Sequence, residues 1–307
     1  MNLNVKNETS RLKTVVLGQP KSLGRVPLLE ETYDAKSYES VKNGEYPSEV
    51  EVVREMTAFE RALTKHGVEV LYPKIIENYN QVFARDVAFV IEDKIIISNM
   101  IADRIDELGA YQEIFAEIPP ENIIHLPKKV RMEGGDVILC NDTIFCGVYK
   151  NSDFYSCKTA RTNPYGIDFL REIFPNKNFV EIPLKKKDTD PYGGILHLDC
   201  TFMPVGNGKA VFYKGCFTDE KTYPFLLDFF GKENVFEVSR EEIYYITTNV
   251  FSISPEIVVS EEKFTRLNCF LEQNWHLTVE KVPYLEVSKM GGLFRCSTMP
   301  LIREDEK

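Results

Sequence analysis

The chain has 307 residues and a formal net charge of −10, with 47 aspartate and glutamate residues against 37 lysine and arginine residues. So acidic a protein repels phosphate backbones and anionic lipid surfaces, which excludes nucleic acid and membrane as expected partners. A small cationic substrate suits this charge. The hydrophobic content of 43% is ordinary for a globular protein with a sizeable core.

The cellular compartment is predicted from what the chain lacks. Residues 1–6 show no basic segment followed by an apolar one, and no apolar run approaches the roughly 20 residues that span a bilayer. The seven cysteines are odd in number and show no CxxC spacing. We therefore expect a cytoplasmic protein with free thiols. The oligomeric state is left open, and a homo-oligomer is possible.

One pattern repeats along the chain: two apolar strands around a polar turn, an amphipathic helix, and a third short strand. Four copies are expected, with their strands and helix at 87–91, 94–98, 103–117 and 123–126; at 137–140, 143–148, 164–174 and 179–182; at 200–205, 209–214, 219–230 and 234–238; and at 250–254, 257–260, 261–275 and 277–282.

A fifth copy can be assembled only from both ends of the chain. Residues 297–302 supply one strand and residues 13–18 supply its neighbour. The helix at 49–65 opens with a capping box at Ser48, and a strand at 68–72 follows it. Pairing the two ends would close a ring without an open sheet edge. We therefore expect one five-unit α/β domain over residues 1–307.

The first strand of each unit begins at a polar residue, and five-fold symmetry would bring these positions together. They are Asp86, Asp136, Asp199, Asn249 and Cys296. Because aspartate and asparagine are also common turn residues before strands, the same pattern has a purely structural interpretation. The irregular stretch 19–47 is interpreted as a surface loop or, alternatively, as a lid over the centre of the ring.

The candidate nucleophile is Cys296, which follows two glycines at 291–292 and stands directly after Arg295. Glycines allow the backbone to approach a ligand closely, and a neighbouring arginine favours a partly exposed thiolate. The alternative is that Cys296 is a buried small hydrophobic residue.

A cysteine nucleophile needs a partner that moves protons. His197, at the head of a unit and close to Asp199, is better placed for this than the other three histidines. Glu133, next to a Gly-Gly turn, is placed to orient His197. Asp86 and Asp199 then remain as two unpaired carboxylates in a small site, which favours a bound cation. A planar guanidinium, with N–H donors on each edge, fits between two carboxylates.

Four short motifs in this order resemble the guanidine-modifying superfamily with the pentein fold, a five-bladed α/β propeller of ββαβ units. The superfamily includes arginine deiminases, dimethylarginine dimethylaminohydrolases and amidinotransferases. The motifs are Ala84-Arg85-Asp86, Met132-Glu133-Gly134-Gly135-Asp136, His197-Leu198-Asp199 and Arg295-Cys296-Ser297-Thr298-Met299-Pro300-Leu301. The resemblance covers nearly the whole chain.

The resemblance implies a role for each matching position. Cys296 is the nucleophile, His197 is the general acid and base, and Glu133 assists His197. Four residues are expected to bind the substrate: Asp86 and Asp199 at the guanidinium, and Arg104 and Arg161 at the α-carboxylate. Asp136 of the second motif is grouped with these substrate-binding residues. The chemistry requires no metal or organic cofactor.

The branch of the superfamily is less clear. Residues 197–199 and the cysteine segment resemble deiminases and amidinotransferases, whereas residues 86–90 and 161–163 resemble the dimethylarginine enzymes. Glu133 argues against the glycine-type amidinotransferases, which tend to have aspartate there. We expect a hydrolase of arginine metabolism, of deiminase type, that acts on the guanidinium of arginine or a related guanidine through a covalent amidino-cysteine. The alternatives are an amidinotransferase and a non-catalytic binding module with the same fold.

Overall fold

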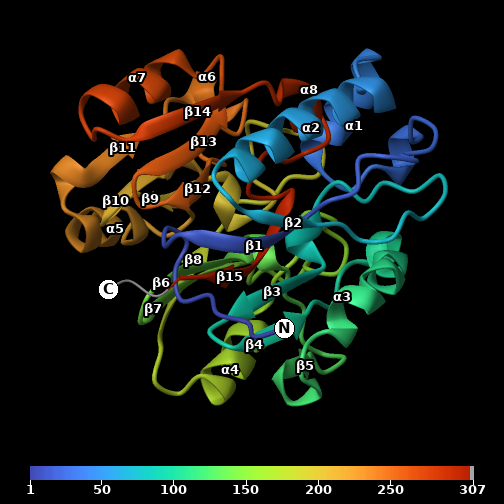
Figure 1. Cartoon of the computed structure of the whole chain (residues 1–307), viewed down its shortest axis with the longest axis horizontal. Helices are drawn as coiled ribbons and strands as arrows, with labels where there is room; N and C mark the ends of the chain where they lie inside the picture. The colour runs from blue at the N-terminus through green and yellow to red at the C-terminus, as the bar shows by residue number, and fades with distance from the viewer. Residues whose placement is uncertain (305–307) are drawn as a thin grey trace.

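A computed structural model describes residues 1–304 as five three-stranded sheets with helices between them (Figure 1). In every sheet the central strand pairs antiparallel with one neighbour and parallel with the other. The sheets are β15 (Thr298–Arg303), β1 (Leu12–Leu17) and β2 (Glu69–Leu71); β3 (Ala88–Ile91), β4 (Lys94–Ile97) and β5 (Ile123–His125); β6 (Val137–Cys140), β7 (Thr143–Val148) and β8 (Asn178–Pro183); β9 (Phe202–Val205), β10 (Lys209–Phe212) and β11 (Val235–Glu237); and β12 (Phe251–Ser254), β13 (Ile257–Glu261) and β14 (Thr278–Val282). The predicted α/β class and the repeated unit are confirmed.

The two ends of the chain form one sheet, as expected. β15 pairs antiparallel with β1, with Leu17 opposite Thr298, and β1 pairs parallel with β2. Successive residues of β1 face opposite sides, so that Val15 packs in one hydrophobic cluster and Val16 in the other. The closing sheet therefore lies between the two cores. That residues 1–307 form a single domain stays a prediction.

The α-helices are α1 (Ala35–Asn43), α2 (Glu49–Lys65), α3 (Gln112–Ala116), α4 (Pro164–Ile173), α5 (Thr222–Phe230), α6 (Arg240–Ile243), α7 (Thr265–Gln273) and α8 (Leu285–Ser288). Helix α2 begins at the predicted capping box, in which Ser48 and Glu51 each bond the other's backbone N–H. No helix within residues 1–304 combines the length and the apolar character that crossing a bilayer requires.

The helix expected at 103–117 differs from the prediction. Most of it is a 3-10 helix, η3 (Ala102–Tyr111), followed by the short α3. A 3-10 helix places residues i and i+3 directly above one another. This geometry aligns the buried Arg104 with Glu107, which form an ion pair of 2.6 Å.

The stretch 19–47 is docked against the rest of the molecule. It contains α1, whose Ser37 and Ser40 hydroxyls donate to the carbonyls of Met290 and Lys289. Figure 1 shows α1 beside α2 and close to α8. The stretch therefore rests on the segment that leads to Cys296.

Candidate active site

The predicted heads of three units lie on short 3-10 turns that meet one another. These turns are η2 (Ala84–Asp86), η5 (Gly134–Asp136) and η6 (Leu198–Cys200). A Cβ atom on Gly134 would lie 2.3 Å from the carbonyl oxygen of Arg85, so only glycine permits this approach. The backbone N–H of Arg85 donates to the carbonyl of Cys296 over 3.0 Å, which joins the fifth head to the first.

Cys296 is buried, with 3% of its surface exposed. Its sulfur lies 3.6 and 3.7 Å from the carboxylate oxygens of Asp199 and 3.9 Å from the sulfur of Cys200. Burial raises the pKa of the Cys296 thiol, and the negative charges of Asp199 and Asp86 raise it further against an opposing contact with Cys200. The expectation of a partly exposed thiol in a positive environment was wrong.

Arg295 lowers the pKa of the Cys296 thiol, but burial and the nearby carboxylates outweigh this effect. Its Nη1 donates to Asp199 Oδ2 over 2.9 Å, and its Nη2 donates to Glu8 Oε1 over 2.7 Å. Burial opposes ionisation of Glu8, but Arg295 outweighs it and lowers the pKa of Glu8 to about 2. Asp199 is therefore not an unpaired carboxylate, contrary to expectation. Asp199 binds Arg295 through one oxygen and lies against the Cys296 sulfur.

His197 lies between two carboxylates and is fully buried. Its Nε2 is 2.9 Å from Glu133 Oε2, and its Nδ1 is 3.6 Å from Asp86 Oδ1. Neither Nδ1 nor Asp86 Oδ1 has a hydrogen-bond partner among the described residues. Burial opposes protonation, but Asp86 and Glu133 outweigh it and raise the pKa of His197. The ring can therefore hold a proton between the two carboxylates.

Glu133 is held as an anion. Burial opposes its ionisation, but Arg161 and His197 lower the pKa of Glu133 to about 2. Arg161 Nη1 donates to Glu133 Oε2 over 2.9 Å, and its other nitrogens donate to the carbonyls of Lys158 and Tyr33. Tyr33 belongs to the stretch 19–47, which therefore touches the site.

Asp86 and Arg104 form the other buried pair. Arg104 Nη1 donates to Asp86 Oδ2, while its Nε and Nη2 donate to Glu107 at 2.6 and 2.9 Å. Every nitrogen of the guanidinium groups of Arg104 and Arg161 thus donates to an acceptor of the protein itself. Their predicted contact with a substrate carboxylate stays a prediction.

Asp136 lies beneath the turn that carries Asp199. Its Oδ1 accepts the backbone N–H of Leu198 over 2.9 Å, and it fits because position 147 is glycine. This contact positions η6. Asp136 Oδ2 has no hydrogen-bond partner among the described residues, and contact of Asp136 with a substrate stays a prediction.

Three residues of the site were assigned no role from the sequence. Asn249 was predicted only as a unit head, yet its amide nitrogen donates to Cys296 Sγ over 3.3 Å and its oxygen accepts the backbone N–H of Arg295. Glu8 and Glu107 had no signal at all, since each is one acidic residue among many. Glu8 pairs with the buried Arg295, and Glu107 pairs with the buried Arg104. A buried arginine needs a nearby acidic residue to neutralise its charge, and this requirement could have pointed to both glutamates.

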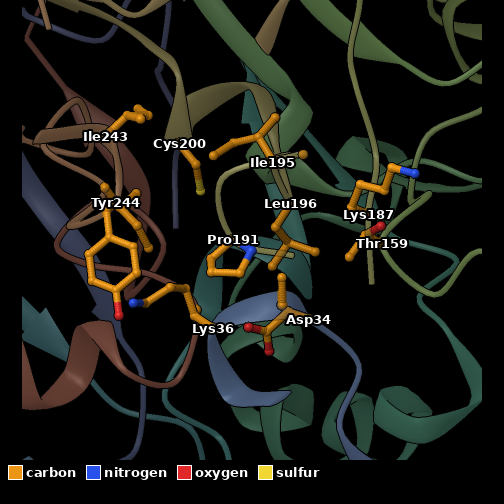
Figure 2. Close-up of a pocket in the computed structure, with 14 residues that line it drawn as sticks. Asp34, Lys36, Thr159, Lys187, Pro191, Ile195, Leu196, Cys200, Ile243 and Tyr244 are labelled. Carbon is orange, nitrogen blue, oxygen red and sulfur yellow. The ribbon is translucent and has the colours of Figure 1, made fainter. Parts of the chain in front are cut away.

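A small pocket lies close to the site (Figure 2). Its lining includes Asp34 and Lys36 of α1 and its cap, Thr159, Ile195, Tyr244 and Cys200. The Cys200 sulfur lies 3.9 Å from that of Cys296, but Cys296, His197 and Glu133 do not belong to the lining.

Two buried groups could hold a metal ion by distance alone. They are Asp86, Glu133 and His197, and Asp199, Cys200 and Cys296, with ligand atoms within 4.8 Å of one another in each. All three carboxylates already pair with arginines. These fixed positive charges oppose a metal cation, and we assign no metal to either group.

The arrangement suits attack on a cationic, planar carbon. The thiol supplies a nucleophile, Asp86 and Asp199 face the same region with negative charge, and His197 supplies a proton. Five ββαβ units with such heads define the pentein superfamily. A model of the family described as "N,N dimethylarginine dimethylhydrolase, eukaryotic" matches residues 31–303, and the chain belongs to this family.

Individual proteins that resemble this chain share a small fraction of its residues. The uncharacterised protein YkgA of Bacillus subtilis is 28% identical over 305 residues, which cover 97% of this chain and 94% of that protein. The structure of an inosamine-phosphate amidinotransferase from Streptomyces griseus matches with a TM-score of 0.76 at 17% identity, over 99% of this chain and 97% of the other. The dimethylarginine dimethylaminohydrolase of Pseudomonas aeruginosa matches with a TM-score of 0.71 at 17% identity, over 95% and 100%.

Proposed function

We propose that the protein is a cysteine-dependent hydrolase that acts on the guanidinium group of arginine or a related guanidine, with Cys296 as nucleophile. The observation that carries this proposal is the placement of Cys296 Sγ within 3.7 Å of Asp199, in a site where His197 lies 3.6 Å from an otherwise unpartnered oxygen of Asp86. A guanidinium bound there offers N–H donors to both carboxylates.

The substrate itself would activate the nucleophile. In the free protein the carboxylates and burial hold Cys296 as a thiol. A guanidinium between Asp86 and Asp199 offsets their negative charge, which lowers the pKa of the thiol and favours the thiolate. Ionisation is thereby tied to the presence of a cation.

The reaction then proceeds in two balanced steps. The thiolate attacks the guanidinium carbon, His197 protonates the departing nitrogen, and ammonia or an alkylamine leaves a planar amidino-thioether on Cys296. Water, deprotonated by His197, adds to that carbon and expels the thiolate to give a ureido product. Glu133 holds the ring of His197, and Arg161 holds Glu133.

An amidinotransferase is the second candidate, favoured by the fold match to the Streptomyces enzyme over nearly the whole of both chains. In that case the amino-acid portion would leave first, and an amine would replace water in the second step.

One experiment separates these candidates. The protein is incubated with arginine, methylated arginines and agmatine, with and without an amine acceptor, and ammonia, alkylamine, ureido product and ornithine are assayed separately. A hydrolase releases ammonia or an alkylamine with an equal amount of ureido product, without an acceptor. An amidinotransferase releases ornithine from arginine only with an acceptor, and no turnover of any of them would refute both.

A further inference from the structure

Asn249 is a buried amide whose oxygen and nitrogen are both fully used. It is 1% exposed. Its Oδ1 accepts the backbone N–H groups of Arg295 and Cys296 over 3.1 and 3.3 Å. Its Nδ2 donates to the carbonyl of Asp199 over 3.1 Å and to Cys296 Sγ over 3.3 Å. The amide therefore joins the turn η6 to the nucleophile.

Two backbone groups fix which way this amide points. A backbone N–H can only donate, so the atom of Asn249 that meets the N–H groups of Arg295 and Cys296 is the oxygen. With the amide reversed, its nitrogen would face two donors and its oxygen would face the carbonyl of Asp199. An N–H of Asn249 is therefore held against the sulfur by contacts that do not involve the sulfur.

The repeat explains why Asn249 reaches the nucleophile. Asn249 stands two positions before β12, and Cys296 stands two positions before β15, so the two residues are equivalent heads of consecutive units. The heads of the other three units are Asp86, Asp136 and Asp199. An ionised carboxylate only accepts hydrogen bonds, whereas an asparagine side chain also donates. The head beside the sulfur is thus the one that can offer it an N–H.

Most of the charge around the nucleophile opposes its ionisation. Burial raises the pKa of its thiol, and the negative charges of Asp199 and Asp86 raise it further. The Cys200 thiol and Arg295 act in the opposite direction. A neutral sulfur is a weak acceptor, but a thiolate accepts an N–H with the strength of a charge-assisted bond. The N–H of Asn249 therefore favours the thiolate over the thiol.

We propose that Asn249 is a catalytic residue whose side-chain N–H stabilises the thiolate of Cys296, both when the thiolate attacks and when it leaves in the second step. No covalent bond to Asn249 forms or breaks. This inference rests on the proposed function of the same site. Because the same nitrogen also holds the carbonyl of Asp199, Asn249 keeps the nucleophile aligned with the turn that carries a carboxylate for the guanidinium.

The first test follows both partners by NMR in wild-type protein that is isotope-labelled at the cysteine Cβ atoms and at the asparagine side-chain nitrogens. The resonances are assigned by their loss in Cys296→Ser and Asn249→Ala. The pH is raised with and without guanidinium chloride, at concentrations far below those that unfold the protein. We expect the Asn249 amide proton to move downfield with the same pKa as the Cβ of Cys296, because a bond to a thiolate is shorter and stronger. This movement should be absent in Cys296→Ser.

The second test removes the donor. In Asn249→Ala with guanidinium present, we expect the pKa of Cys296 to lie at least about one pH unit above that of the wild type. We expect kcat to fall at least about tenfold and KM to change less than about threefold, since the carboxylates for the guanidinium remain. Asn268→Ala is the matched control, because Asn268 is buried in α7 and its amide donates to the carbonyl of Glu261 over 2.8 Å. It should keep the wild-type pKa of Cys296.

The outcomes separate this inference from the proposed function. If guanidinium ionises Cys296 while the Asn249 proton does not move, the role of Asn249 is overturned and the proposed function stands. An unchanged pKa of Cys296 in Asn249→Ala overturns that role as well, even if kcat falls, because loss of structure alone can lower kcat. A Cys296 resonance that responds to neither pH nor guanidinium would instead refute the cation-activated nucleophile, and this inference with it. The melting temperatures of both alanine variants are measured alongside.

Discussion

At the scale of single residues, the site is a set of arginine–carboxylate pairs around one thiol and one imidazole. Arg295, Arg161 and Arg104 each hold a carboxylate in place, and those carboxylates in turn face Cys296 or His197. Because buried ion pairs lose much of their attraction to desolvation, they are better explained by orientation than by stability. Each pair fixes the position of a carboxylate beside Cys296 or His197.

Replacing the nucleophile should stop turnover without unfolding the protein. Cys296→Ser puts a hydroxyl, a far weaker nucleophile than a thiolate, in the same space, and we expect a loss of activity of at least about a thousandfold. Mass spectrometry of acid-quenched wild-type protein should show an adduct on Cys296. Cys200→Ala, which changes the thiol 3.9 Å away, is the control and should retain that adduct. An adduct on Cys200 instead would contradict the assignment.

Removing the charge of Glu133 should weaken the acid function of His197. The pKa of His197 is raised, so its proton is retained above the ordinary value and lost as pH rises through the raised pKa. Glu133→Gln removes one cause of that rise, and the proton is then lost at lower pH. We expect kcat to fall about a hundredfold. Titration of the His197 ring by NMR tests the direction, and an unchanged or higher pKa in the variant would contradict it.

The N–H donors of the guanidinium should decide whether the protein prefers a methylated or an unmethylated substrate. Asp86 Oδ1 has no partner in the described structure and needs an N–H from the guanidinium. Methyl groups on one terminal nitrogen remove donors there, and an unpaired buried acceptor costs on the order of 1–3 kcal/mol. We expect an unmethylated guanidine to exceed asymmetric dimethylarginine at least about tenfold in kcat/KM. Equal rates for both would instead favour the reaction named by the matching family.

The sequence allowed the residues that meet in the candidate site to be predicted but not their partners. Cys296, His197 and Glu133 stand in short motifs at the heads of repeated units, so their meeting follows from the repeat. The pairing of Arg295 with Glu8 joins residues 287 positions apart and follows no local pattern. The same absence of a local signal explains why the thiol was expected to be exposed and electropositive.

At the scale of elements, glycines decide how closely the short 3-10 turns of the site approach one another. Gly135 on η5 lies against the imidazole, and a Cβ atom there would be 2.6 Å from His197 Cγ. Such a contact is too short, so the ring would have to move. The Gly-Gly turn beside Glu133 is therefore part of how His197 is held.

A single methyl group on this turn should consequently impair activity. Gly135→Ala displaces His197, and we expect kcat to fall at least about tenfold, since misplacing a catalytic group by an ångström can cost far more. Gly109→Ala is the control, because nothing lies within 4 Å of a Cβ at that position. Steady-state kinetics of both variants provide the measurement. Full activity in Gly135→Ala would show that the ring is not held by this contact.

Most strands were predicted to within one or two residues, because alternation and turn residues mark them clearly. Helix type was predicted less well at 102–111, where burial of the Arg104–Glu107 pair favours a 3-10 helix over the α-helix expected from apolar spacing. Helix α1 was not predicted, since its buried residues Ser37 and Ser40 are polar and bond to carbonyls of the cysteine segment.

At the scale of the whole molecule, the N-terminal segment stabilises the site through Glu8. The pKa of Glu8 falls from 4.5 to about 2 on folding, so this carboxylate stabilises the fold above pH 4.5 and ceases to do so as pH falls toward about 2. Glu8→Gln lacks this dependence. Between pH 6 and pH 3 the wild type should lose about 2 kcal/mol more unfolding free energy than the variant.

Urea unfolding of both proteins at the two pH values measures this difference, with Glu45→Gln as a control that behaves like the wild type. Equal losses in wild type and Glu8→Gln would show that Arg295 does not depress the pKa of Glu8. The variant itself should be less stable at pH 6, because Arg295 loses a charged partner.

The pairing of β1 with β15 also has a consequence for synthesis of the chain on the ribosome. Leu17 is synthesised long before its partner Thr298. At about 5–20 residues per second, the interval between them is on the order of 15–60 s. During that time one edge of β1 has no partner and is open to pairing with another chain. Cys296 lies two positions before β15, so the candidate nucleophile and the closing strand emerge together. A growing chain therefore holds the carboxylates and the histidine of the site long before it acquires the thiol.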